Sequence, residues 1–232
     1  MIIANVATYP GRYGNRRRSI QSIATQVDVL NICLNEYSEV PDDLRDISNA
    51  NYYFPENNLK DVGKFAFEVS ENDDVFLCDD DIIYPQNYVS AMLKYSLSFK
   101  DQPTILGVHG VIYSDYYDGR KRSGRLVHVF DKALDEGAYM NQLGTGTVFL
   151  KGRELPSYEE MRSSAGFVDI RLAKISFEKN INLYCIPREA EWLKEIQNDS
   201  SIYLTVTSNL PIDALKEVQS FGGLAKLPNL LE

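Results

Sequence analysis

The sequence predicts an α/β protein in which helices flank a mostly parallel sheet. In its first half, short apolar segments alternate with amphipathic segments of helical period, which is typical of parallel strands joined by right-handed crossovers. One apolar segment, 75–78, runs directly into three aspartates. The 232 residues, 44% of them hydrophobic, suffice for one sizeable core. We therefore expect a single domain with a C-terminal tail.

Hydrophobic spacing places the elements along the chain. Strands are expected at 2–8, 29–34, 51–54, 75–78, 105–113, 146–151 and 183–186. Helices are expected after a cap at Asn15, at 60–70, after Pro85, at 169–179 and at 212–221. Ligands of such sheets bind where parallel strands end, so the tips after residues 8, 34 and 78 should share one cleft.

The three aspartates that follow the strand at 75–78 suggest a cation site. Because side chains alternate along a strand, Asp79 and Asp81 are expected on one face and Asp80 on the other. Mg²⁺-like ions take one or two carboxylates together with phosphate oxygens, so such a pair suits a cation that binds a diphosphate. The alternative is a solvated acidic turn.

Composition excludes several classes of protein. A net charge of −9 argues against nucleic acid as the main partner. No apolar run reaches the roughly 18 residues that span a bilayer, and the chain opens directly on a strand without a signal peptide, which predicts a cytoplasmic location. Cys33, Cys78 and Cys185 lie in apolar strands, so we expect small buried hydrophobes and no disulfide or metal site.

Two basic runs interrupt this acidic chain, at 16–18 and 120–122. Such runs are usually solvated faces. The alternative is that either run docks an anionic acceptor or lipid headgroups, which allows a peripheral contact with the inner face of the membrane.

Four segments carry a family resemblance. They are VATYPGR followed by SIQSIATQ; NICLNEYSEVP; NNLKDVGKFAF leading to DDVFLCDDDIIYPQNYV; and LGTGTVFL followed by GFVDIRLAKISFEKNINLYCIPR. In this order they resemble the GT-A fold of nucleotide-sugar glycosyltransferases, specifically the family-2-like inverting enzymes, over about residues 2–190. The resemblance implies a nucleotide-sugar-binding half at 1–100, an acceptor-binding half at 101–190, and a helical extension at 191–232 that packs on the domain.

The resemblance also implies a donor site. Its nucleotide-sugar-binding residues would be Thr8, Tyr9, Pro10, Arg12, Asn35, Glu36, Asp61, Lys64, Asp79 and Asp80. Asp81, with Asp79, would hold Mn²⁺ or Mg²⁺ in a DXD-type motif. A guanidinium such as that of Arg12 forms forked hydrogen bonds with phosphate. For Asp61 and Lys64 the alternative is an ordinary solvated helix face.

Inverting transfer requires a base that takes the proton of the acceptor hydroxyl, and the resemblance assigns this role to Asp169. Val168 stands where the family has a glutamate, which is a departure from the pattern. The alternative is that Asp169 only caps its helix.

Four further residues are candidates for the acceptor side. His109 would approach the acceptor or act as an alternative base, or else is a structural histidine, as we expect for His128. Thr145 and Gly146 allow close approach to sugar hydroxyls. Trp192 either stacks on a sugar or fixes the tail to the domain.

These features predict an enzyme: a metal-dependent glycosyltransferase that moves a sugar from a UDP-sugar to a glycan or lipid-linked acceptor in bacterial surface polysaccharide synthesis. One alternative is a non-catalytic sugar-nucleotide or glycan-binding module on the same fold. Another is a nucleotidylyltransferase, which the loop TYPGRYGN disfavours because it lacks the Gly-x-Gly-Thr-Arg pattern. An NAD-binding domain is disfavoured because Gly-x-Gly-x-x-Gly is missing after Thr8.

Overall fold

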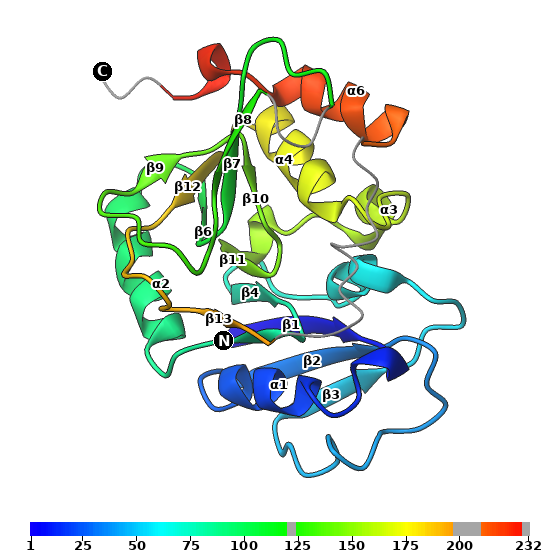
Figure 1. The fold of residues 1–232 in the computed structure, drawn as a ribbon. Helices are drawn as coiled ribbons and strands as arrows, with labels where there is room; N and C mark the ends of the chain where they lie inside the picture. Colours follow the sequence, from blue (N-terminus) through cyan, green and yellow to red (C-terminus); the bar gives the residue numbers. More distant parts are fainter. Residues whose placement is uncertain (120–123, 197–209, 229–232) are drawn as a thin grey trace.

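A computed structural model of the protein describes residues 1–119, 124–196 and 210–228. Its centre is an eight-stranded sheet in the order β3-β2-β1-β4-β11-β6-β12-β9 (Figure 1). The strands are β1 (Ile2–Thr8), β2 (Val29–Leu34), β3 (Ala50–Tyr53), β4 (Asp74–Cys78), β6 (Thr104–Gly107), β9 (Ala138–Tyr139), β11 (Thr147–Lys151) and β12 (Asn182–Cys185). Strands β3, β2, β1 and β4 run parallel, as do β6 and β12, while β11 is antiparallel to its neighbours β4 and β6. The predicted α/β class and mostly parallel sheet are confirmed.

Smaller elements complete the domain. A three-stranded sheet contains β7 (Gly110–Tyr113), β8 (Arg125–His128) and β10 (Gln142–Leu143), and β5 (Ile82–Ile83) pairs with β13 (Lys194–Glu195). The α-helices are α1 (Arg16–Ala24), α2 (Tyr88–Ser96), α3 (Tyr158–Met161), α4 (Val168–Glu178) and α6 (Ile212–Phe221). Short 3₁₀ helices are η1 (Pro10–Arg12), η2 (Lys60–Phe65), η3 (Leu97–Phe99), η4 (Gly152–Glu154) and η5 (Leu224–Lys226).

Two apolar clusters form the core on opposite faces of the sheet. Along β4, Val75 and Leu77 belong to the cluster that contains α4 and α6, whereas Phe76 and Cys78 belong to the cluster that contains α1 and α2. This is the alternation expected of a strand buried on both faces. It explains why the segment is continuously apolar.

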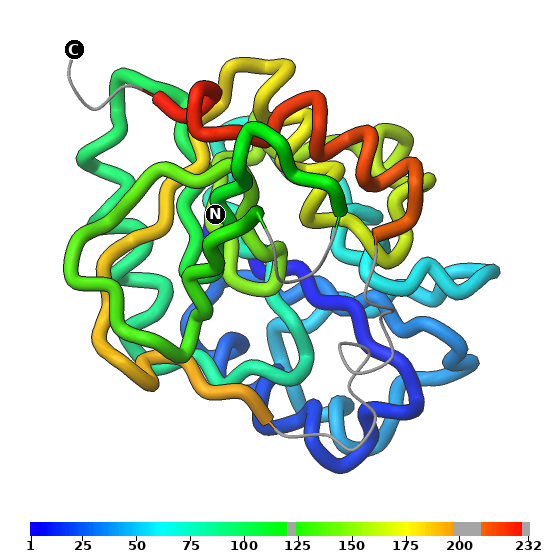
Figure 2. The backbone as a smooth tube through the Cα atoms, turned by 45° about the horizontal axis from the view of Figure 1, so that its top comes forward, coloured from blue at the N-terminus to red at the C-terminus, as the bar shows by residue number. Residues whose placement is uncertain are grey.

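The C-terminal part packs on the domain through α6 and Trp192. Figure 2 shows α6 beside α4 from a second direction. Arg171 of α4 donates to both carboxylate oxygens of Glu217 in α6, at 3.0 Å from Nε. Trp192 lies 5.7 Å from the Tyr88 ring, and its Nε1 donates to Asn87. None of the described helices combines the length and hydrophobicity needed to cross a membrane.

Three expected elements differ in the structure. The expected strand 105–113 is divided at Val108 and His109 into β6 and β7, which belong to different sheets. The expected helix 60–70 is only the short η2, because Phe65, Phe67 and Val69 have the two-residue spacing of extended chain. Helix α2 begins at Tyr88 rather than directly after Pro85.

One tyrosine joins the two strand ends nearest the aspartates. Tyr84 is 2% exposed, and its hydroxyl donates to the Gly146 carbonyl at 2.6 Å and accepts the Asp79 N–H at 2.8 Å. The phenol therefore ties the end of β4 to the start of β11.

We expect Tyr84→Phe to destabilise the protein by about 2 kcal/mol, because it leaves a buried N–H and a buried carbonyl without a partner. For a chain of this size that lowers Tm by roughly 5 °C. Thermal unfolding followed by circular dichroism measures the shift. Tyr116→Phe is the matched control, since Tyr116 is 94% exposed; equal Tm values for the two variants would contradict the role given to Tyr84.

Candidate active site

A cleft of about 530 Å³ lies at the carboxyl ends of β1, β2 and β4. The residues that line it are Ala7, Thr8, Tyr9, Arg12, Asn35, Asn58, Lys60, Asp61, Lys64, Asp79, Asp80, Asp81 and Gly166. The strand tips expected to converge therefore do so. Parallel pairing of β1 with both neighbours brings these chain-distant residues to one edge of the sheet.

Most residues proposed for donor binding line this cleft, but Pro10 and Glu36 do not. Pro10 begins η1, and Glu36 adopts a left-handed backbone, with φ 61°, immediately after Asn35. Sequence reasoning missed Ala7, Asn58, Lys60 and Gly166. Of these, Gly166 is held in place by a hydrogen bond. Its N–H donates to Asp61 Oδ1 at 2.8 Å, which joins the loop before α4 to η2.

The three aspartates are divided between two cations. Asp79 Oδ1 lies 2.6 Å from Lys64 Nζ, whereas Asp81 Oδ2 lies 2.9 Å from Arg12 Nη2 and Asp80 Oδ1 lies 3.5 Å from Arg12 Nε. The strict alternation expected of the three side chains does not hold. Strand β4 ends at Cys78 and Asp80 begins a turn, so Asp80 and Asp81 share Arg12 while Asp79 turns to Lys64.

Burial disfavours the charged form of Asp80 and Asp81, and the nearby cations do not fully compensate for it. It raises the pKa of Asp80 to about 6, against the opposing effects of Thr8 and Arg12. Burial, together with the neighbouring Asp79 carboxylate, raises the pKa of Asp81 to about 7. A further positive charge beside these carboxylates is therefore favourable.

The cleft also offers donors to an anion. Arg12 is 8% exposed, and its Nε and Nη1 are buried without a hydrogen-bond partner among the described residues. Buried donors rarely stay unpaired, so these nitrogens suit phosphate oxygens.

A divalent cation fits this site only together with such an anion. Within residues 1–119, 124–196 and 210–228, no group of three or more His, Cys, Asp or Glu is arranged to hold a metal. Mg²⁺ commonly binds through one or two carboxylates plus substrate phosphates. Asp79 and Asp81 would supply the carboxylates, and a diphosphate held by Arg12 would supply the remaining oxygens.

Asp169 lies beside the cleft, in the first turn of α4. Its Oδ1 accepts both the backbone N–H and the hydroxyl of Thr145, at 2.8 and 2.7 Å. The residue before α4 is Phe167, and no side chain caps that helix. The alternative that Asp169 only caps its helix is therefore wrong, because its carboxylate bonds outside the helix.

The four acceptor candidates have different surroundings in the structure. Thr145 contacts Asp169, and Gly146 lies so close to Asp79 that a Cβ there would be 2.0 Å from Oδ2. His109 precedes β7; burial lowers its pKa and nearby Asp169 opposes the effect. Trp192 instead makes the contacts expected of a residue that fixes the tail.

Two arginines of the first basic run are paired with aspartates, whereas Arg18 is exposed. Arg16 is fully buried and lies 2.6 Å from Asp43, and Arg17 lies 2.6 Å from Asp46. The second run, 120–122, lies outside the described residues.

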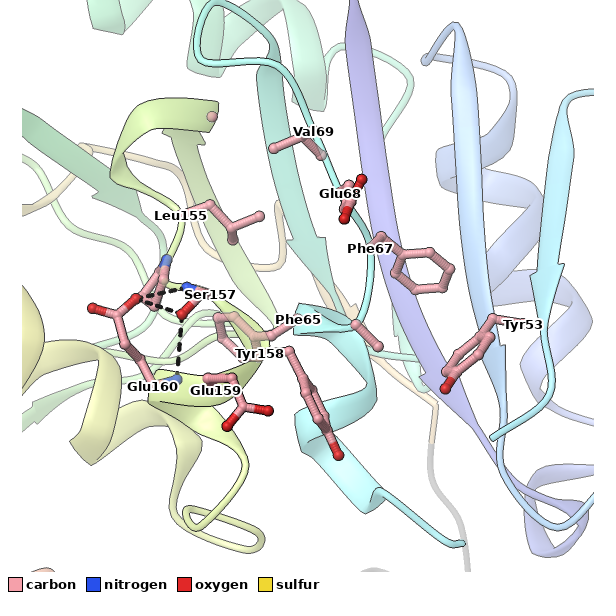
Figure 3. A pocket seen from close by; sticks show the side chains of 13 residues that line it. Tyr53, Phe65, Phe67, Glu68, Val69, Leu155, Ser157, Tyr158, Glu159 and Glu160 are labelled. Atoms are coloured by element: carbon pink, nitrogen blue, oxygen red, sulfur yellow. Dashed lines mark hydrogen bonds between the residues drawn. The ribbon is translucent and has the colours of Figure 1, made fainter. Parts of the chain in front are cut away.

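A second groove, of about 620 Å³, lies on another side of η2 (Figure 3). Phe65 of η2 contributes to it, with Tyr53 and Phe67 at one end and Glu159 and Glu160 at the other. Its described lining includes several glutamates and no lysine or arginine. It is therefore less suited to a phosphate ligand than the cleft at the strand ends.

Comparison with known proteins supports the fold assignment. No family model and no curated protein matches the sequence. The crystal structure of S. aureus TarS 1-349 superposes with a TM-score of 0.52 at 11% identity, covering 82% of this chain and 58% of that chain. A second S. aureus TarS structure gives 0.52 and 11%, covering 95% of this chain and 44% of that chain. The protein therefore shares its fold with these TarS structures and spans about half of their length.

We expect Asp79→Ala to destabilise the protein by about 2 kcal/mol, because it leaves the buried ammonium of Lys64, 3% exposed, without its main partner. Adding Lys64→Met to Asp79→Ala should restore part of that loss, since no buried charge then remains. Urea unfolding of the four proteins of this cycle gives the coupling energy. A double variant as unstable as the sum of the singles would show that the pair contributes nothing.

Proposed function

We propose that this protein is a metal-dependent glycosyltransferase that moves a sugar from a nucleoside diphosphate donor, with UDP-sugars as the first donors to test. The observation that carries the proposal is the meeting of residues from all four resemblance segments in one cleft, where the fourth contributes Gly166 and places Asp169 beside it. TarS, which shares the fold, is a glycosyltransferase, and this supports the class of reaction.

Five residues of the cleft have roles in this reaction. Arg12 binds the donor phosphates through its unpaired nitrogens. Asn35 and Asp61 contact the base and ribose from the end of β2 and from η2. Asp79 and Asp81 hold Mn²⁺ or Mg²⁺, which when bound stabilises the negative charge of the departing nucleoside diphosphate.

Asp169 acts on the acceptor side. Its carboxylate accepts the proton of the acceptor hydroxyl as that oxygen attacks the anomeric carbon, and the nucleoside diphosphate leaves from the opposite face. This in-line displacement inverts the anomeric configuration. We propose a glycan or lipid-linked acceptor, a family-2-like mechanism, and a cytoplasmic role in bacterial surface polysaccharide synthesis. A lipid-linked acceptor would bring the protein into peripheral contact with the membrane.

Donor binding should be linked to the metal. A ligand at 100 times its Kd stabilises a fold by about 2.7 kcal/mol, which raises Tm by roughly 5–10 °C here. In a thermal-shift screen of nucleotide sugars, we expect a cognate donor to produce this shift only with Mn²⁺ or Mg²⁺. Asp81→Ala should abolish the metal-linked part of the shift. A shift that is equal with EDTA would remove the metal from the proposal.

Transfer should depend on Asp169 separately from binding. We expect Asp169→Asn to keep the metal-linked donor shift and to lower kcat by about 10²–10⁴-fold, the usual contribution of a general base. Nucleoside diphosphate release measured with acceptor present gives kcat. Full activity of the variant would place the base elsewhere, and donor binding without any turnover in the wild type would favour a non-catalytic sugar-nucleotide-binding module.

A further inference from the structure

A chain of hydrogen bonds joins the two halves of the candidate active site. Lys64 Nζ donates to Asp79 Oδ1 at 2.6 Å and to Thr145 Oγ1 at 3.1 Å. Thr145 Oγ1 in turn donates to Asp169 Oδ1 at 2.7 Å. One buried ammonium thus links the carboxylate at the end of β4 with the carboxylate at the start of α4.

The direction of every bond in this chain is fixed by chemistry. An ammonium only donates and a carboxylate only accepts, whereas a hydroxyl has one proton to give. The Thr145 hydroxyl must therefore accept a hydrogen bond from Lys64 and donate its own to Asp169. Asp169 Oδ1 also receives the Thr145 N–H, so two donors hold one oxygen. No described residue donates to its Oδ2, which is left for another partner.

The centre of the network is buried, so the geometry of Lys64 and Thr145 is strongly constrained. Lys64 is 3% exposed and Thr145 is 2% exposed. Burial acts to lower the pKa of Lys64, but the surrounding carboxylates, chiefly Asp79, outweigh it and raise the pKa. A buried cation of this kind is retained only while its hydrogen bonds are made, because an unpaired one is costly.

We propose that Thr145 and Lys64 are positioning residues for sugar transfer, a role that rests on the function proposed above. Thr145 holds Asp169 by Oδ1 and so presents Oδ2 to the acceptor hydroxyl. Lys64 holds Asp79 by Oδ1 in the same way, while Asp79 Oδ2 packs against Gly146. Because both bonds leave one nitrogen, the base and the donor-side carboxylate are kept at a fixed separation, and a misplaced base loses rate steeply.

Paired threonine variants test the first half of this proposal. Thr145→Val removes the hydroxyl and keeps the shape and backbone N–H, so we expect kcat to fall about 10–100-fold, as for loss of a bond to a charged group, with donor KM changed less than about threefold. Thr145→Ser keeps the hydroxyl and should retain kcat within about threefold. Thr104→Val, a buried threonine at the amino end of β6, is the control and should leave both constants unchanged.

Lys64→Met tests the link to Asp79. Since Lys64 bonds Asp79 directly and acts on Asp169 through Thr145, this variant should raise donor KM and lower kcat together. Combined with Thr145→Val, it should lower kcat no further than Lys64→Met alone, because the two residues act through one chain of bonds. Lys94→Met, on the exposed face of α2, is the matched control.

Three outcomes would overturn the proposal: an active Thr145→Val variant, a Thr145→Ser variant as impaired as Thr145→Val, or strictly additive effects of Lys64→Met and Thr145→Val. Unfolded variants are identified by circular dichroism, and the coupling of Lys64 with the Thr145 hydroxyl is then measured by urea unfolding of Lys64→Met, Thr145→Val and their combination. Zero coupling there overturns the network itself. If the wild type neither binds nor uses any nucleotide sugar, the proposed function fails while this stability coupling persists.

Discussion

The carboxylates at the end of β4 are the constraint on which the rest of the site depends. A strand buried on both faces delivers three consecutive aspartates to a partly buried cleft, where like charges repel strongly. Two cations reduce this repulsion. Lys64 forms an ion pair with Asp79, and Arg12 forms ion pairs with Asp80 and Asp81. Their positions in turn require that η2 and η1 lie against the strand ends.

Close packing around glycines allows these charged residues to approach one another. At Gly63 a Cβ would lie 2.6 Å from Cys33 Sγ, so η2 can approach β2 only with glycine there, and Lys64 follows directly. Gly146 serves the same purpose for Asp79 from the side of β11. The charge pairs of the cleft therefore depend on the close backbone approach that these two glycines allow.

Much of the fold was predictable because it follows from hydrophobic pattern. Apolar runs marked β1, β2 and β4, and the spacing of apolar residues at 212–221 marked α6. The pattern failed where tertiary contacts decide. An apolar run does not show that a strand leaves its sheet after Gly107, and the extended segment after Phe65 depends on packing rather than on local preference.

The sequence predicted several residues of the site, but not the ion pairs and hydrogen bonds that join them. Strand ends and the family resemblance indicated Arg12, Asp79 and Asp169 separately. The pairing of Arg12 with Asp80 and Asp81 was not predictable, because it needs the turn that follows Cys78. The Lys64–Thr145–Asp169 chain joins residues 81 and 24 positions apart, and only the three-dimensional arrangement shows that the same hydroxyl serves both.

The charge balance of the cleft bears on why a metal should accompany the donor. Its described lining contains Asp61, Asp79, Asp80 and Asp81 against Arg12, Lys60 and Lys64, so the acids are in excess. A free nucleoside diphosphate sugar would add negative charge to this excess, at a high cost in a partly buried cleft. A donor that arrives with a divalent cation adds little net charge. Arg12 can then turn its unpaired nitrogens to the phosphates while the cation meets the carboxylates, and each charge in the cleft gains a partner of opposite sign.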